Sequence, residues 1–267
     1  MTLPGLFVVG TDTGVGKTVV ASSIARAWRE AGRRVGVLKP VASGAGWLDG
    51  RLIAGDTLSL LDSIGGDVPP DRVTPIVFEE PLAPHVAARR LGSPLLMDDL
   101  SRAVSESLFW WEDRADVMVV EGVGGLLCPL AEGATVADLA VFLDYPLLIV
   151  ARRGLGTLNH TLMTVEAARM RSLRVAGVVL NGASPTTDPV AEATNAGELA
   201  RRLGGVAILA EWEHGDTSNH ARVAPEAGGW YDLAKPPRSR PSSPRTAAEP
   251  GPTGRDSPSI PRGGEVR

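Results

Sequence analysis

The apolar residues of this chain fall into short runs that alternate with longer amphipathic stretches. Residues 6–9 are too few and too rich in β-branched side chains for a helix, so they predict a buried strand. Residues 19–31 place apolar side chains on one helical face and arginines on the opposite face. The chain therefore begins with a strand, a loop and a helix.

The same alternation continues along most of the sequence. Further strands are expected at residues 34–39, 117–121, 146–151, 175–181 and 206–209. Further helices are expected at residues 55–64, from about 85, at 97–110, 136–143, 156–170 and 189–203. Apolar strands that alternate with helices are typical of the α/β class, with a mainly parallel sheet and helices on both faces. Ligands of such folds bind beyond the carboxyl ends of the strands.

The loop after the first strand, residues 10–18, has the sequence Gly-Thr-Asp-Thr-Gly-Val-Gly-Lys-Thr. Between a strand and a helix, such a glycine-rich turn points backbone N–H groups at a phosphate, and the helix N-terminus adds partial positive charge. Lys17 can then reach the terminal phosphates, and the Thr18 hydroxyl can bind Mg²⁺. The pattern predicts a phosphate-loop NTPase fold, against the alternative of a chance Gly-Lys-Thr in a turn.

Other polar side chains follow the remaining strands. Glu121 ends the strand at 117–121 and can hold Mg²⁺, although a solvent contact is the alternative. Lys39, Ser43, Asn159 and Asn181 also come soon after strands. Because parallel strands end at one edge of a sheet, these residues should gather beside the phosphate loop.

Composition and charge exclude several classes of protein. The net charge of −4 gives no electrostatic reason for binding nucleic acid or an anionic membrane. A single cysteine, Cys128, excludes an internal disulfide. No apolar run approaches the roughly 20 residues that span a bilayer. We expect a cytoplasmic enzyme.

The composition changes near residue 234. Residues 235–267 contain eight prolines, seven basic residues and three acidic residues, with almost no large apolar side chains. Such a segment cannot bury enough apolar surface to offset the entropy of ordering. We therefore expect one α/β domain at residues 1–233 and a disordered tail at 234–267.

Four motifs, in order, resemble dethiobiotin synthetase across about residues 5–210. They are the phosphate loop at 10–18, Lys-Pro-Val-Ala-Ser-Gly at 39–44, Val-Glu-Gly-Val-Gly-Gly at 120–125, and Gly-Thr-Leu-Asn-His at 156–160. The resemblance implies an ATP-dependent and Mg²⁺-dependent cyclo-ligase that closes a ureido ring on 7,8-diaminononanoate with CO₂ or bicarbonate. It implies a carbamate that attacks the γ-phosphate, a carbamic-phosphoric anhydride, and ring closure by the second amine.

The resemblance also assigns roles to individual residues. Catalysis would depend on Lys17, Lys39 and Thr13, and Mg²⁺ would be held by Thr18, Asp56 and Glu121. Substrate contacts would come from Thr13, Ser43, Gly124, Gly125, Gly156 and Asn159. ATP contacts would come from Gly14, Val15, Gly16, Lys17, Thr18, Val19, Glu121, Gly122, Val123, Gly124, Asn181, Glu211, Trp212 and Glu213. Relatives tend to carry Glu-x-Pro where this chain has residues 211–213.

The resemblance further implies a homodimer in which the diamine lies at the subunit interface. Its carboxylate end would be held by the helix that begins near Gly156 in the partner chain.

Three other functions share the phosphate loop. A partition-type ATPase switch would require lysine where this chain has Asp12, and an amidating synthetase would require a glutaminase domain. Cys128 lies in an apolar context that predicts packing and no nucleophile. A small-molecule kinase remains open, because transfer to a hydroxyl uses the same phosphate-binding groups.

Overall fold

The computed structural model describes residues 3–185, 188–215 and 230–235. The strands are β1 (Gly5–Gly10), β2 (Val35–Leu38), β3 (Val41–Ser43), β4 (Gly46–Leu48), β5 (Arg51–Ile53), β6 (Ile76–Phe78), β7 (Val117–Gly125), β8 (Pro129–Ala131), β9 (Ala134–Thr135), β10 (Leu147–Arg152), β11 (Val175–Asn181) and β12 (Ile208–Trp212). The helices are α1 (Lys17–Glu30), α2 (Gly55–Ile64), α3 (Pro70–Val73), α4 (Pro84–Arg90), α5 (Met97–Trp111), α6 (Val136–Leu143), α7 (Thr157–Met170) and α8 (Pro189–Arg202).

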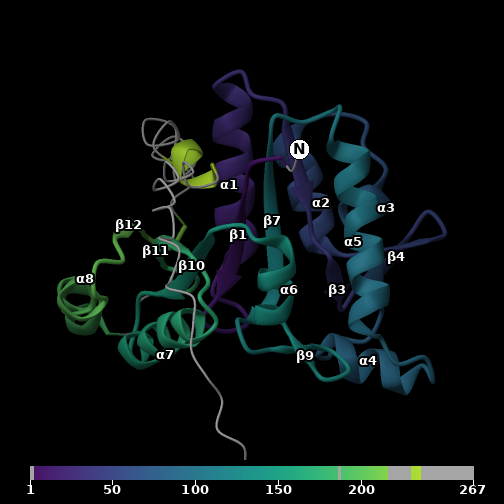
Figure 1. Cartoon of the computed structure of the whole chain (residues 1–267). Helices are drawn as coiled ribbons and strands as arrows, with labels where there is room; N and C mark the ends of the chain where they lie inside the picture. Colours follow the sequence, from purple (N-terminus) through teal and green to yellow (C-terminus); the bar gives the residue numbers. More distant parts are fainter. Residues whose placement is uncertain (1–2, 186–187, 216–229, 236–267) are drawn as a thin grey trace, which may run out of the picture. The chain divides into compact units, whose positions relative to one another are not determined.

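Six strands form one parallel sheet in the order β12-β11-β10-β1-β7-β2. Figure 1 shows β10, β1 and β7 side by side, with β1 in the centre. Because β7 lies between β1 and β2 and all three strands are parallel, the segments that follow these strands begin beside one another. This topology confirms the predicted α/β fold and places the phosphate loop at the carboxyl edge of the sheet.

The central strands are covered on both faces. Every residue of β1 and β2 is buried, as are the first six residues of β7. Helix α1 packs against β1, β2 and β7, and α7 packs against β10. Strands buried on both sides explain why the sequence shows continuous apolar runs in place of a hydrophobic–polar alternation.

The predicted elements are present, with shifted ends. Helix α6 has the predicted bounds, where Thr135 and Asp138 form a capping box. Strand β7 continues to Gly125 past its predicted end at Glu121. Strand β12 begins at Ile208, two residues later than predicted, and ends at Trp212, so Glu211 and Trp212 belong to the strand.

Several short elements were not predicted. Strands β3 and β6 pair in parallel, β4 and β5 form an antiparallel pair, and β8 pairs with β9. Two- or three-residue strands are too short to show a hydrophobic period. Their pairing depends on contacts that are distant in sequence.

The C-terminal boundary was predicted after residue 233. Just before this boundary, Trp230 is buried against the core, and Tyr231 packs edge-to-face on Trp28. Ala234, one residue beyond the boundary, is also buried. Residues 236–267, most of the predicted tail, lie outside the described residues. No helix in the described part of the chain is long and apolar enough to cross a membrane.

Candidate active site

The phosphate loop depends on two glycines with left-handed backbone. Gly14 and Gly16 have φ angles of 72° and 88°, a region that other residues enter only with strain. A Cβ atom on Gly10 would lie 2.6 Å from the Asp12 carbonyl oxygen and 3.0 Å from Lys17 Nζ. The loop can therefore fold back over the lysine only because these positions carry no side chain.

The N-terminus of α1 faces the same space. Helix α1 begins at Lys17, and no side chain caps its first turn. Its first backbone N–H groups are therefore available to an anion, and the helix dipole favours negative charge there. Lys17 is buried, and its ammonium donates to the Asp12 carbonyl oxygen at 3.2 Å. This arrangement suits the terminal phosphates of a nucleotide.

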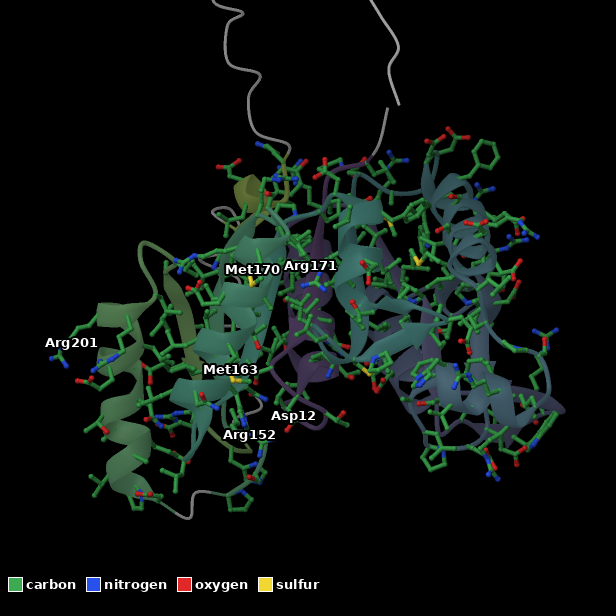
Figure 2. All side chains as sticks on the ribbon, turned by 60° about the horizontal axis from the view of Figure 1, so that its bottom comes forward. Asp12, Arg152, Met163, Met170, Arg171 and Arg201 are labelled. Carbon is green, nitrogen blue, oxygen red and sulfur yellow. The ribbon has the colours of Figure 1, made fainter. Side chains whose placement is uncertain are left out.

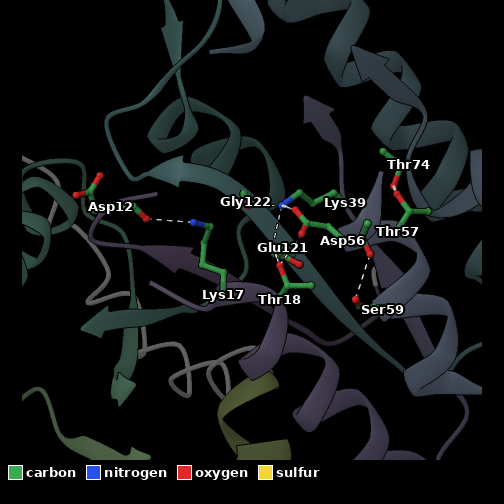
Figure 3. Close-up of polar contacts among 11 residues, drawn as sticks. Asp12, Lys17, Thr18, Lys39, Asp56, Thr57, Ser59, Thr74, Glu121 and Gly122 are labelled. Atoms are coloured by element: carbon green, nitrogen blue, oxygen red, sulfur yellow. Dashed lines mark hydrogen bonds and ion pairs between the residues drawn. The ribbon is translucent and has the colours of Figure 1, made fainter. Parts of the chain in front are cut away.

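Beside the loop, the buried Lys39 forms the centre of an ion cluster with Glu121, which is also buried, and the partly exposed Asp56 (Figure 3). Its ammonium lies 2.7 Å from Asp56 Oδ2 and 2.8 Å from Glu121 Oε1, and it donates to the Gly122 carbonyl oxygen at 3.1 Å. Lys39 follows β2, Glu121 lies within β7, and Asp56 lies in the first turn of α2. Three elements that are distant in sequence thus build the cluster.

Thr18 connects this cluster to α1. Its hydroxyl lies 2.9 Å from Asp56 Oδ1 and 2.8 Å from Glu121 Oε1. Because a hydroxyl has one proton, it can donate to only one of these two carboxylates at a time. The Thr18 hydroxyl thus lies next to one oxygen atom of each carboxylate.

Burial and the neighbouring charges shift the pKa values of these groups. Burial lowers the pKa of Lys39, but the carboxylates of Glu121 and Asp56 outweigh this effect and raise it above its usual value. Burial lowers the pKa of Lys17, and the charge of Lys39 lowers it further. Burial alone would raise the pKa of Asp56, but Lys39 and Thr18 hold it below its usual value. The carboxylate and the ammonium of the Asp56–Lys39 pair thus stabilise each other's charge.

The oxygen atoms of this cluster fit Mg²⁺. Glu121 Oε2 is buried without a hydrogen-bond partner, which leaves it available to a cation. Carboxylate and hydroxyl oxygens are the ligands that Mg²⁺ prefers, and it usually binds one or two carboxylates together with substrate phosphates. No group of three or more His, Cys, Asp or Glu suited to a metal occurs among the described residues.

A cavity of about 650 Å³ opens over the phosphate loop and the ion cluster. Fourteen of the predicted site residues line it: Thr13, Gly14, Gly16, Lys17, Thr18, Val19, Lys39, Ser43, Asp56, Glu121, Val123, Gly124, Asn181 and Glu213. Asn181 ends β11, and its side-chain amide donates to the Val15 carbonyl oxygen at 2.9 Å. This hydrogen bond joins the end of β11 to the phosphate loop that follows β1.

The remaining predicted residues lie outside the cavity lining. Val15 and Gly122 contribute carbonyl oxygens to Asn181 and Lys39, as described above, and Gly125 lies at the end of β7. The Trp212 side chain is buried in the core, and Glu211 lies 3.9 Å from Arg153 in a partly exposed ion pair. Of the three ATP contacts predicted at residues 211–213, only Glu213 lines the cavity.

Gly156 and Asn159 are separate from the cavity of their own chain. Both are exposed at the start of α7, and Gly156 has a φ angle of 89° at the N-cap. No side chain caps this helix, so its first backbone N–H groups are also available to an anion. Fourteen predicted residues line the cavity, whereas Gly156 and Asn159 lie at the start of α7 and do not.

Four lining residues were not predicted: Gly182, Ala183, His214 and Gly215. His214 Nδ1 lies 3.0 Å from the Gly182 carbonyl oxygen. Gly182 and Ala183 follow β11, and His214 and Gly215 lie just beyond β12. The rule that ligands bind beyond strand ends could therefore have found these four residues.

Comparison with known proteins identifies close relatives. The family described as an AAA domain matches residues 4–220. An ATP-dependent dethiobiotin synthetase of Anaeromyxobacter dehalogenans is 46% identical over 200 residues, covering 74% of this chain and 84% of that protein. The enzyme of the same name from Bacillus licheniformis is 41% identical over 212 residues, covering 78% and 84%. That of Methanocaldococcus jannaschii is 38% identical over 176 residues, covering 66% and 78%.

The two glycines of the loop should differ in how they tolerate alanine. At Gly14 a Cβ meets no atom within 4 Å, so Gly14→Ala adds only backbone strain, about 1–2 kcal/mol. At Gly16 a Cβ would lie 2.0 Å from Asn181 Nδ2, so Gly16→Ala should cost about 1–3 kcal/mol more. Urea unfolding without ligand measures both values. Equal losses of unfolding free energy would show that the Asn181 contact does not constrain the loop.

Proposed function

The chain belongs to the dethiobiotin synthetase family, an ATP-dependent group of enzymes, and on that premise we propose how its own residues close the ring. The reaction joins 7,8-diaminononanoate and CO₂ with the conversion of ATP to ADP and phosphate. One observation carries the proposal: two buried lysines, an uncapped helix N-terminus and two carboxylates converge on one cavity. That set of charges suits a phosphoryl transfer.

The proposed sequence has three steps. One amine of the diamine combines with CO₂ to form a carbamate. A carbamate oxygen attacks the γ-phosphorus of ATP, the bond to the bridging oxygen breaks, and ADP leaves with that electron pair. The second amine then attacks the carbonyl carbon of the carbamic-phosphoric anhydride, loses a proton, and expels phosphate as the ureido ring closes.

The residues around the cavity support the phosphoryl transfer. Thr18, Asp56 and Glu121 would hold Mg²⁺, which supplies positive charge to the phosphate oxygens when bound. Lys17 and the N–H groups at the start of α1 would hold the terminal phosphates. Lys39 would neutralise the charge that develops between the carbamate and the γ-phosphate. Because a carbamate is a weak nucleophile, fixing its position contributes a large part of the rate.

Hydrogen-bond donors and close backbone would position the substrates. Thr13 and Ser43 line the cavity and would donate to the carbamate. Gly124 has a φ angle of 60°, and a Cβ there would lie 2.8 Å from Cys128 Sγ. The position therefore requires glycine, whose bare backbone would let the substrate approach closely. At the nucleobase end, Asn181 and Glu213 are the predicted residues that line the cavity.

We further propose a homodimer with the diamine at the interface. Helix α7 exposes Met163 and Met170, which Figure 2 labels along the same helix. Leu155 just before α7, and Val141 and Phe142 of α6, are also exposed. Exposed apolar side chains mark an interface where they gather on one face, as Met163 and Met170 do seven residues apart on α7. The start of α7, at Gly156 and Asn159, would hold the substrate carboxylate in the partner's site, and a two-fold axis would repeat this contact.

The first test is the coupling of ATP to ring closure. Purified protein with Mg²⁺, ATP, bicarbonate and 7,8-diaminononanoate should produce dethiobiotin and ADP in equal amounts. Omitting the diamine should abolish both products, because the carbamate is the attacking group. Product analysis by mass spectrometry measures the ratio. Steady ADP formation without the diamine would instead indicate an ATPase switch.

The second test concerns the shared site. A Lys17→Ala variant and an Asn159→Ala variant should each be nearly inactive. When equal amounts are mixed and exchange subunits, half of the dimers become hybrids with one intact site and one doubly damaged site. About a quarter of the sites, and thus about a quarter of wild-type activity, should return.

The control for subunit exchange is a mass tag on one variant. If Asn159 serves the phosphate loop of its own chain, every site keeps one lesion and the exchanged mixture stays inactive. That outcome would contradict the interface site and leave the first test unaffected.

A further inference from the structure

The ammonium of Lys39 lies between the two carboxylates that the proposed function assigns to Mg²⁺. From this position we infer that Lys39 is an exchangeable substitute for the divalent cation. In the absence of metal and nucleotide it holds Asp56 and Glu121 together, and the binding of the metal displaces it toward the phosphates. The inference rests on the proposed metal site.

The contacts of Lys39 resemble those of a bound cation. An ammonium has three N–H donors, and here they are directed to Asp56 Oδ2, Glu121 Oε1 and the Gly122 carbonyl oxygen. All three acceptors are oxygen atoms within 3.1 Å. The Lys39 side chain is 3% exposed, so water cannot replace these contacts. The ammonium is thus fully satisfied by the groups that a metal would need.

The second oxygen of Glu121 is left incomplete. Glu121 is 1% exposed, and its Oε2 has no hydrogen-bond partner. A buried carboxylate oxygen without a partner is costly, and a ligand bound during function would complete its contacts. Because Lys39 has no further proton to donate, that ligand must be another cation or donor that enters from the cavity.

Lys39 and a divalent cation cannot both lie between the carboxylates. Charges of the same sign at hydrogen-bond distance in a buried site repel strongly. A metal that arrives alone must therefore leave a buried ammonium without its counter-ions, which is unfavourable. When the metal arrives with a nucleotide, the phosphate oxygens offer the displaced ammonium new partners.

This exchange has two consequences for function. Metal and nucleotide should each raise the affinity of the protein for the other, because the phosphates stabilise the ammonium that the metal displaces. In addition, Lys39 should reach the γ-phosphate only after the metal has bound. The same side chain would thus offset part of the carboxylate charge in the empty site and become available when the reactants are in place.

The test measures Mn²⁺ binding without nucleotide, by the electron paramagnetic resonance signal of the free ion. The wild-type protein should bind Mn²⁺ weakly. Lys39→Met removes the competing ammonium and should tighten binding by at least about tenfold. If that variant does not fold, Lys39→Gln, whose amide can still donate to one carboxylate, provides the same comparison. Mn²⁺ should also raise the melting temperature of the Lys39 variant more than that of the wild type.

Lys17→Met is the matched control. Lys17 also carries a positive charge near the carboxylates, but its ammonium bonds to the Asp12 carbonyl oxygen and does not bridge them. Its removal should tighten Mn²⁺ binding by no more than about threefold. Equal gains in both variants would show a general charge effect, and an unchanged affinity in the Lys39 variant would show no competition. Either result would overturn the inference.

A separate measurement checks the metal site itself. With a non-hydrolysable ATP analogue present, wild-type protein should bind Mn²⁺, and Glu121→Gln should weaken that binding. Failure here would mean that the proposed metal site is wrong. Success here, with no gain in the Lys39 variant, would mean that the metal site is right and the exchange is wrong.

Discussion

The buried contact between Lys39 and the carboxylates of Glu121 and Asp56 is the interaction on which the site depends. Taking an ammonium and a carboxylate out of water costs several kcal/mol for each ion, and only close, well-directed partners offset that cost. The Lys39 ammonium has three oxygen acceptors, and Glu121 Oε1 contacts both Thr18 and Lys39. The cluster therefore fixes the relative positions of α1, α2, β2 and β7.

The sheet topology makes this contact possible. Strand β7 inserts between β1 and β2, so the residues that end these strands are neighbours although they are distant in sequence. The phosphate loop follows β1, Lys39 follows β2, and Glu121 is in register opposite Val8 of β1. Because β1, β2 and the first part of β7 are buried, the charged residues of the site lie toward the carboxyl ends of these strands. The residues of the site thus lie where the continuous apolar runs of the strands end.

The sequence predicted the fold and most of the cavity lining, for a physical reason. A parallel sheet requires long apolar strands, and a phosphate loop requires glycines at fixed positions, so both leave local signals. Strand β12 was predicted poorly because, within the described residues, it pairs with β11 alone, and the exposed Glu211 interrupts its apolar run. The bridging position of Lys39 could not be predicted, since it depends on how α2 approaches the ends of β2 and β7. The burial of Trp212 depends on the same kind of long-range packing.

A double-mutant cycle on Lys39 and Glu121 tests the central interaction most directly. The free energy of unfolding would be measured in urea, with EDTA and without nucleotide, for Lys39→Met, Glu121→Met and the double variant. Each single change should destabilise the fold by about 3–5 kcal/mol, because it removes one of the few partners of a buried charge. The double variant should be more stable than the sum of the single effects predicts by about 2–3 kcal/mol. Single effects that add to within about 0.5 kcal/mol would contradict a direct interaction between the two side chains.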